Sequence, residues 1–586
     1  MQKIYFKYLT NNYEKLFISR ASELLYKNSI DTYRLKLHNT KSIIEELISI
    51  CQSANLGLLS NNDYSQSTAS EILSMLDEEN ENIIFNRINR DYYKDIIKHT
   101  KKDNYNRIIQ ASKIILEDNK NYLENLFLKI NEIISSIAII NEKEIHQKNK
   151  NLLVLTNYLF IELVNKGFSK QYLYYVFQVI FIYKDFDHFC FCERFKKWKE
   201  LCFRNPENFT VVYNIISNDF QISELKKIDD AYILINSKWR KNIAKLNSDR
   251  VNIFLEENKM NKLVGMDVNA LDYFKALEIS REKLSKDLDL YHLGLNSHLF
   301  EIDKQAAVIG TNEPDKSSTI PSNFQIDGHL NSNIKVFDQL LKKVHKIKKN
   351  NIDSASLDKL YSAIRYLRTG SQSPELETKL LNYWIGLEYI FTSSLSEEKT
   401  IDRIKKYYPI CHALVYVRRN LYDFHKSIIR NNLSHLFVDF NNDLKYLTSY
   451  NNYNIIIENS DNELLKFRAL FFQKWAGSPG DITISLNKHK GNLSWNIIRL
   501  YRIRNEIVHN AAIKNGIYSN ISHMKYYLTF ILNSILDFMS KDAIDLDNDG
   551  KITIEDYFIA QDIMYGSLKN NTISSYLKVR TPSNII

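Results

Sequence analysis

The chain has 586 residues, of which 44% are apolar and 25% charged, and its formal net charge is +9. These proportions are typical of a globular protein and exclude a disordered or fibrous chain. Only 7 Pro and 14 Gly are present, which favours long helices joined by few turns.

An odd number of unevenly spaced cysteines argues against a disulfide framework and predicts a reducing compartment. The first 20 residues carry scattered charges and do not look like a signal peptide. No apolar run approaches the roughly 18 to 20 residues of a membrane helix, and the longest, Tyr174–Tyr183, is better explained as a buried core segment. We therefore expect a cytoplasmic protein that does not contact a membrane.

Taken in chain order, residues 1–205 are almost free of helix breakers and predict an all-α domain. Residues 206–311 predict a small α+β domain. Its helix is expected at Ala270–Asp287. Its strands are expected, from runs of β-branched, aromatic and other apolar residues, at Phe209–Ile216, Ala231–Ile235, Val251–Leu255, Lys262–Val268, Leu299–Ile302 and Ala306–Ile309.

A segment rich in Pro, Ser, Asn and Asp follows, and residues 312–334 are predicted to be a linker. Helical periodicity resumes in residues 335–541, with expected breaks at 441–452 and at the Gly/Pro loop Ala476–Gly491. Residues 542–586 form a predicted calcium loop and tail. The expected fold is therefore mainly α, with a helical N-terminal domain, a small α+β middle domain and a C-terminal helical bundle.

The basic residues are concentrated in the C-terminal bundle. Between Lys335 and Ser540 there are 29 Lys and Arg against 18 Asp and Glu, a net charge of +11, whereas the rest of the chain sums to −2. This excess favours a polyanionic partner, although a solvated helix face explains it equally well. The candidate RNA-binding residues are Arg502, Lys342, Lys343, Lys346, Lys348 and Lys349.

The most informative stretch is Leu500–Asn510 (LYRIRNEIVHN), which is predicted to be helical. At 100° per residue, Asn505 and His509 share a stripe with Arg502, while Arg504 lies about 140° from His509. An adjacent stripe is apolar and suited to the core; it consists of Leu500, Ile503 and Ile507.

These side chains suit cleavage of RNA without a metal ion. A histidine with an ordinary pKa of about 6.5 can take the proton of the 2′-hydroxyl or give one to the leaving 5′-oxygen. Arg504 can stabilise the negative charge that develops on the phosphate, and Asn505 can orient the histidine or bind the phosphate. A second pair with the same spacing, Arg430 and His435, is not flanked by the residues that surround Arg504 and His509. It is interpreted as accidental or as an RNA contact.

Three segments of the bundle resemble Apea-like HEPN domains. Ser373–Thr392 (SPELETKLLNYWIGLEYIFT) is similar to the second-helix signature of that family, Ile497–Asn510 to its Arg-Asn-x-x-x-His helix, and Lys525–Met539 to its closing helix. By this resemblance Arg504, Asn505 and His509 have the catalytic roles. Glu388 could pair with an arginine of the motif, or form a structural ion pair between helices.

HEPN proteins are commonly metal-independent endoribonucleases that act as dimers and leave 2′,3′-cyclic phosphate ends. The resemblance implies that activity here, together with a role in bacterial antiviral defence or as a toxin, set off by a protein or phage-derived trigger. The alternative is an inactive HEPN module that binds RNA or a protein partner. A purely structural oligomerisation protein is a third class, which the basic excess disfavours.

A second motif lies in the C-terminal tail. The segment from Asp545 to Asp556 (DLDNDGKITIED) resembles an EF-hand calcium loop, with Asp instead of the usual Glu at position 12, as in dockerins. Oxygen ligands at this spacing suit Ca²⁺, and we expect a structural site. The predicted ligands are Asp545, Asp547, Asp549, the backbone carbonyl of Lys551, Thr553 and Asp556.

The group His188, Cys190, Cys192 and Cys202 contains four residues of types that bind zinc. The spacing is not that of a zinc site, and the surrounding aromatic residues favour buried cysteines in an apolar core. No phosphate-binding loop, dinucleotide fingerprint or nucleophile elbow is present, which argues against an NTPase, a dehydrogenase or an α/β-hydrolase.

Overall fold

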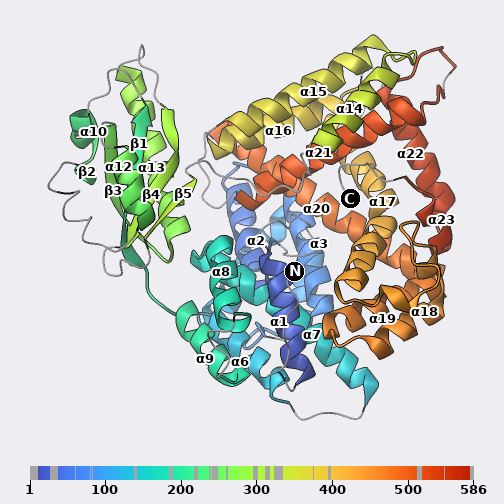
Figure 1. Cartoon of the computed structure of the whole chain (residues 1–586), viewed down its shortest axis with the longest axis horizontal. Helices are drawn as coiled ribbons and strands as arrows, with labels where there is room; N and C mark the ends of the chain where they lie inside the picture. The colour runs from blue at the N-terminus through green and yellow to red at the C-terminus, as the bar shows by residue number, and fades with distance from the viewer. Residues whose placement is uncertain are drawn as a thin grey trace. The chain divides into compact units, whose positions relative to one another are not determined.

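The protein is described by a computed structural model and is mainly helical, with one small antiparallel sheet (Figure 1). The residues that the structure describes are 9, 11–26, 37–59, 61–79, 81, 83–136, 141–183, 189–216, 222–235, 239, 249–258, 262–294, 301–310, 317–321, 334–373, 375–393, 397–510, 518–546 and 548–580. Asp547, His188 and most of the predicted linker lie outside these residues.

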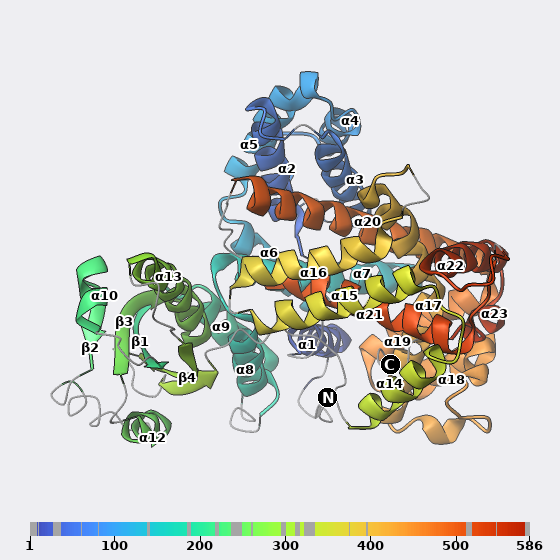
Figure 2. The same cartoon turned by 90° about the horizontal axis from the view of Figure 1, so that it is seen from above.

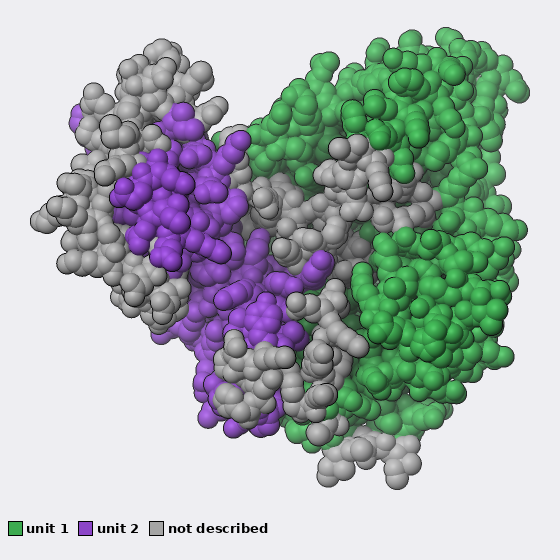
Figure 3. Space-filling model, viewed as in Figure 1, with its two compact units in different colours: residues 1–24, 28–159, 327–586 green, residues 25–27, 160–326 purple. Residues whose placement is uncertain are grey.

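The chain divides into two compact units, coloured separately in Figure 3. Unit 1 comprises residues 1–24, 28–159 and 327–586, and unit 2 comprises residues 25–27 and 160–326. The first helices of the chain therefore belong to the same unit as the C-terminal bundle that carries the motif. The predicted domain boundary after residue 205 does not coincide with a boundary between units.

The early helices confirm that the breaker-poor N-terminal region is helical. A capping box starts α2, in which Asn39 accepts a hydrogen bond from the Ser42 amide at 2.8 Å while its own amide donates to the Ser42 hydroxyl at 3.1 Å. In chain order the helices are α1 (Asn12–Leu25), α2 (Thr40–Asn55), α3 (Asp63–Glu78), α4 (Arg90–Lys98), α5 (Tyr105–Asp118), α6 (Tyr122–Ile134), α7 (Glu142–Lys166), α8 (Lys170–Phe181) and α9 (Phe191–Cys202).

The C-terminal region is a bundle of longer helices. Pro479 begins α20, and that helix continues without interruption through Gly491, so the predicted loop 476–491 is wrong. The helices are α14 (Ile334–Ile347), α15 (Ser354–Gln372), α16 (Leu376–Phe391), α17 (Thr400–Arg430), α18 (Tyr450–Asn459), α19 (Glu463–Gly477), α20 (Pro479–Asn510), α21 (Tyr518–Lys541), α22 (Ile554–Leu568) and α23 (Ile573–Leu577).

Helix α20 runs through the middle of unit 1. It packs against α3 on one side and against α16 and α17 elsewhere, as Figure 2 shows. Its predicted apolar stripe is confirmed, since Leu500, Ile503 and Ile507 are all buried. The polar residues of the motif are thus displayed from a helix whose other faces are held by the core.

Unit 2 contains a five-stranded antiparallel sheet with the order β2-β3-β1-β4-β5. Its strands are β1 (Glu207–Ile216), β2 (Tyr232–Leu234), β3 (Lys262–Ala270), β4 (Glu301–Gly310) and β5 (Ser318–Pro321). Its further helices are α10 (Ile222–Ile228), α12 (Asp249–Glu257) and α13 (Tyr273–Gly294). Helices α13 and α12 cover opposite faces of the sheet (Figure 2), as the side-chain alternation along β1 requires.

Three predictions for this region are wrong. The segment Val251–Leu255 is part of helix α12, because Val251, Phe254 and Leu255 have helical spacing and bury one face together. The described parts of the two strands expected at 299–302 and 306–309 belong to one strand, β4. The predicted linker 312–334 contains β5, which pairs with β4 and buries Ile320.

The apolar run at 174–183 lies largely in α8 and is buried as expected, through Val176, Phe177, Ile180 and Phe181. Tyr175 and Tyr183 are the exceptions and are exposed. Across the described residues, no helix is both long enough and apolar enough to cross a membrane.

Candidate active site

The Arg-Asn-x-x-x-His motif occupies the last two turns of α20. The side chains of Arg504 and Asn505 are partly exposed, and that of His509 is exposed. None of the three therefore lies in a dry interior. Access from solvent is what a catalytic role in RNA cleavage requires.

Arg504 is held on two sides. Its Nη1 donates a hydrogen bond to Asn505 Oδ1 at 2.9 Å, and its Nη2 lies 3.6 Å from Glu388 Oε2 on α16. Both members of the ion pair keep about a quarter of their side-chain surface exposed. Glu388 therefore pairs with an arginine of the motif and links two of the three helices that carry the HEPN-like segments, a contact that fits both of the alternatives considered for it.

Asn505 is also fixed from the N-terminal side. Its Nδ2 donates to the hydroxyl of Tyr64, in the first turn of α3, at 3.1 Å. The ring of Tyr501 lies one turn earlier on α20, 6.4 Å from the Tyr64 ring and 5.5 Å from that of Trp384 on α16. The motif turn is thus bordered by α3 on one side and α16 on the other.

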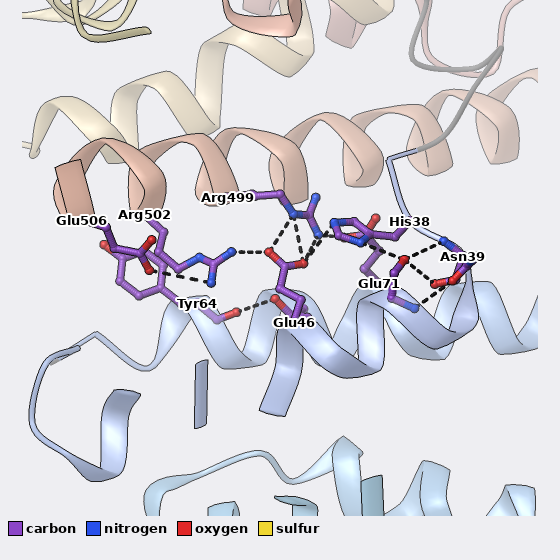
Figure 4. A network of polar contacts seen from close by, with 10 residues as sticks. His38, Asn39, Glu46, Tyr64, Glu71, Arg499, Arg502 and Glu506 are labelled. Atoms are coloured by element: carbon purple, nitrogen blue, oxygen red, sulfur yellow. Dashed lines mark hydrogen bonds and ion pairs between the residues drawn. The ribbon is translucent and has the colours of Figure 1, made fainter. Parts of the chain in front are cut away.

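A buried network of charged side chains lies just before the motif on α20 (Figure 4). Glu46 on α2 accepts hydrogen bonds from Arg499, the shortest at 2.8 Å, and from Arg502, while Arg499 also donates to Glu71 on α3 at 2.6 Å. Burial would raise the pKa of Glu46, but the two guanidinium groups dominate and hold that pKa well below its usual range. Glu46 is therefore a carboxylate that neutralises two buried cations.

Ion pairs between the N-terminal helices and the C-terminal bundle share one polarity. Among the residues that the structure describes, six such pairs are formed, and in each the carboxylate comes from α1, α2 or α3 and the cation from the bundle. The pairs are Glu23–Arg468, Glu46–Arg499, Glu46–Arg502, Asp63–Lys405, Glu71–Arg499 and Glu78–Lys488. Part of the basic excess of the bundle is thus neutralised within the chain.

The candidate RNA-binding residues fall into two groups. Arg502 is 8% exposed and bound to Glu46, and Lys343 is 4% exposed with its Nζ 3.0 Å from Asp537 Oδ1, so neither faces solvent. The other four lysines are exposed on or just after α14: Lys342, Lys346, Lys348 and Lys349. A polyanion can reach only this second group without rearrangement.

The second Arg/His pair has a different structural setting. Arg430 is the last residue of α17, whereas His435 lies in the following 3₁₀ turn, Ser434–Leu436. Both side chains are exposed. Because the two residues do not share a helix, they lack the rigid support that α20 gives to the first motif.

The calcium-like loop is closed by its last carboxylate. Asp556, only 1% exposed, accepts hydrogen bonds from the Leu546 amide at 3.0 Å and the Thr553 amide at 2.8 Å. Asp545 accepts from the amide of Gly550 at 2.8 Å, and Gly550 has a φ of +82°. The tight turn at position 6 therefore requires glycine, as in EF-hand loops.

This loop has a partner in the bundle. Ile552, at position 8, forms a parallel β-bridge with Ile352 in the turn between α14 and α15, and the Ile552 amide donates to the Asn351 carbonyl at 2.9 Å. This bridge ties the loop to the bundle. Among the described residues, which omit Asp547, no cluster of three or more metal-binding side chains is found.

The cysteines of the zinc-like group do not share one environment. Cys202 is fully buried at the end of α9, where desolvation raises the pKa of its thiol well above the usual value. Cys190 and Cys192 are exposed, so the expectation of buried cysteines is confirmed only for Cys202. His188 lies outside the described residues.

The chain was compared with protein-family models, curated proteins and solved structures. No family model, no curated protein and no solved structure matches it. The resemblance to HEPN domains and to EF-hand loops therefore rests on sequence segments of this chain alone. The arrangement of side chains on α20 is the structural observation that bears on function.

Proposed function

We propose that this protein is a HEPN-type endoribonuclease that cleaves RNA without a metal ion and uses Arg504, Asn505 and His509. The observation that carries the proposal is their arrangement on α20. Arg504 is held by Asn505 and Glu388 yet partly exposed, and His509 is exposed one turn further along the same rigid helix. A phosphate and a ribose could reach these groups from solvent.

In the proposed reaction, the imidazole of His509 takes the proton of a ribose 2′-hydroxyl and the 2′-oxygen attacks phosphorus. The bond from phosphorus to the 5′-oxygen breaks, that oxygen takes up a proton from solvent, and His509 then releases the proton of the 2′-hydroxyl to solvent. The guanidinium of Arg504 stabilises the charge on the non-bridging oxygens. The products are a 2′,3′-cyclic phosphate and a free 5′-hydroxyl.

The test is cleavage of single-stranded RNA in EDTA. Wild type should generate 2′,3′-cyclic phosphate ends, detected by mass spectrometry of the fragments. His509→Ala should lower the rate by about 10² to 10⁴, the usual value of positioned acid–base catalysis. His435→Ala is the matched control, because His435 is also exposed and belongs to the second Arg/His pair.

Cleavage that persists in His509→Ala and disappears in His435→Ala would transfer the catalytic role to the second pair. Wild-type protein that leaves tRNA and total RNA intact would refute the nuclease proposal.

One observation favours the alternative, an inactive HEPN module that binds RNA or a protein. Asn505 and Arg502 both bind residues of the N-terminal helices, as structural side chains do. A scaffold of this kind would bind RNA through the exposed lysines of α14 with a steep salt dependence and would not cleave it.

The remaining features of the proposal follow from the HEPN resemblance. They are a homodimer, a cytoplasmic role in bacterial antiviral defence or as a toxin, and a protein or phage-derived trigger. In a dimer of motif helices, the exposed residues Val508 and His509 are available to a second copy. Arg502 contacts Glu46 on α2 and Asn505 contacts Tyr64 on α3, so these two side chains face helices of their own chain.

We also propose that the loop from Asp545 to Asp556 binds Ca²⁺ as a structural site. The closure of the loop by Asp556 and the positive φ of Gly550 fit such a role. The residues that would hold the ion are Asp545, Asp547, Asp549, the Lys551 carbonyl, Thr553 and Asp556.

Calorimetric titration with Ca²⁺ tests this site. Wild type should release or absorb heat with a stoichiometry of one, and Asp545→Ala should abolish the signal. Asp542→Ala is the control, because Asp542 lies just outside the loop and pairs with Arg580. Identical flat traces for wild type and Asp545→Ala would rule the site out.

A further inference from the structure

Tyr64, in the first turn of α3, contacts the motif on α20 directly. It is 6% exposed, and its hydroxyl accepts a hydrogen bond from Asn505 Nδ2 at 3.1 Å. Its ring packs against Tyr501, one turn before the motif. Burial raises the pKa of the Tyr64 phenol, so the group stays neutral at physiological pH and keeps its hydrogen-bonding role.

The contacts of Asn505 determine which way its amide points. The amide oxygen accepts from Arg504 Nη1, and the amide nitrogen donates to Tyr64. If the amide were turned over, its NH₂ group would face the guanidinium, and two donors would oppose each other. Because a phenol hydroxyl can donate or accept, Arg504 selects this orientation, and the hydrogen bond to Tyr64 anchors the Asn505 amide in the place from which it holds Arg504.

Helix α3 is fixed relative to α20 along its whole length. Asp63, beside Tyr64, lies 3.2 Å from Lys405 Nζ on α17. Two turns further on, Glu71 binds Arg499 at 2.6 Å, and Glu78 at the end of α3 pairs with Lys488. The Tyr64 hydroxyl is thus held at a fixed place against the motif.

We propose that Tyr64 is a positioning residue of the RNA-cleaving site, which orients Asn505 and, through it, the guanidinium of Arg504. The inference rests on the proposed nuclease function. It makes α3 a component of the site, so residues more than 400 positions apart in the chain build one constellation.

The test compares Tyr64→Phe with wild type in the RNA cleavage assay. Loss of this one hydrogen bond should lower kcat about 5- to 30-fold, because the guanidinium is less well placed in the transition state. KM should change less than twofold, because the exposed basic residues that attract RNA are untouched. A residue with a merely structural role would give no such separation of kcat from KM.

Tyr93→Phe is the matched control. Tyr93 is also fully buried, and its hydroxyl bonds to Ser112 Oγ at 2.8 Å within the helices α4 and α5. Its replacement removes an equivalent buried hydrogen bond from the same unit but leaves the motif unchanged. Cleavage by Tyr93→Phe should therefore stay within twofold of wild type, with a thermal midpoint similar to that of Tyr64→Phe.

A double variant identifies the route of the effect. In an Asn505→Ala background, Tyr64→Phe should cause no further loss of kcat, since the residue through which it acts is gone. Multiplying effects in the double variant, or a Tyr64→Phe enzyme as active as wild type, would overturn the positioning role while leaving the nuclease proposal intact. A wild-type protein that cleaves no RNA would refute both.

Discussion

Glu46→Gln is expected to destabilise unit 1 by about 3 to 5 kcal/mol, the usual cost of removing one partner from a buried ion pair. The side chain of Glu46 is 9% exposed and is the shared acceptor of Arg499 and Arg502, which are equally inaccessible. Glutamine has the same shape but no charge. Two buried guanidinium groups would then depend on Glu71, which contacts Arg499, and on Glu506, whose Oε1 is 3.9 Å from Arg502 Nη1.

Urea unfolding followed by tryptophan fluorescence measures this loss, because Trp384 and Trp475 are buried in unit 1. Glu45→Gln is the matched control on the same helix. Glu45 is 48% exposed and its Oε1 lies 3.9 Å from Lys41 Nζ, so its replacement should change stability by less than about 0.5 kcal/mol. Equal midpoints for the two variants would show that Glu46 does not stabilise α20.

The N-terminal partners of α20 are the part of the candidate site that the sequence does not predict. The motif helix and its apolar stripe follow from local spacing, and the HEPN-like segments offer a pairing of Glu388 with an arginine of the motif as one of two alternatives. The partners Glu46, Tyr64 and Glu71 lie more than 400 residues earlier. No local pattern marks them, because an acidic residue on a helix surface looks the same whether it meets water or a buried arginine.

The errors in the predicted elements have local causes. Pro479 and Gly491 suggested a loop, yet proline is favourable in the first turn of a helix, and a helical glycine costs only about 1 kcal/mol. Burial of Ile482, Leu486 and Leu493 on the same helix outweighs that cost. Strand β5 was hidden in a polar segment because it is a short edge strand that ends in Pro321, where a missing amide donor is tolerated.

A second large effect concerns acid. Three buried histidines of the bundle should make the protein lose about 5 kcal/mol of stability between pH 6.5 and pH 5. Burial lowers the pKa of His489 to about 3 and that of His523 to about 4, and it takes the pKa of His412 well below its usual range. Each imidazole is therefore neutral when folded but gains a proton below about pH 6.5 when unfolded.

The hydrogen bonds explain why these groups resist charge. His412 Nε2 lies 2.9 Å from the Tyr526 hydroxyl, which accepts a hydrogen bond from Arg419, and His412 Nδ1 lies 2.8 Å from His489 Nε2. One of these two facing ring nitrogens must accept, so protonating both histidines would place two N–H donors against each other near the charge of Arg419. His523 accepts from Asn496 Nδ2 at 2.9 Å through its Nδ1 and faces the charge of Arg499.

The stability falls as the pH falls because the folded and unfolded states bind different numbers of protons. Because the folded pKa values lie below the unfolded value of about 6.5, the unfolded chain binds more protons as the pH falls. The stabilising contribution is complete above pH 6.5 and is lost toward the folded pKa values, at about 1.4 kcal/mol per pH unit for each histidine. Glu46, whose pKa is also depressed, adds a further loss below about pH 4.5.

Urea unfolding at pH 7, 6 and 5 measures the slope, and His489→Gln should reduce it by about 1.4 kcal/mol per pH unit below pH 6. A wild-type protein equally stable at pH 7 and pH 5 would mean that these imidazoles titrate in the folded state. The contacts that join Arg419, Tyr526, His412 and His489 would then tolerate a positive charge.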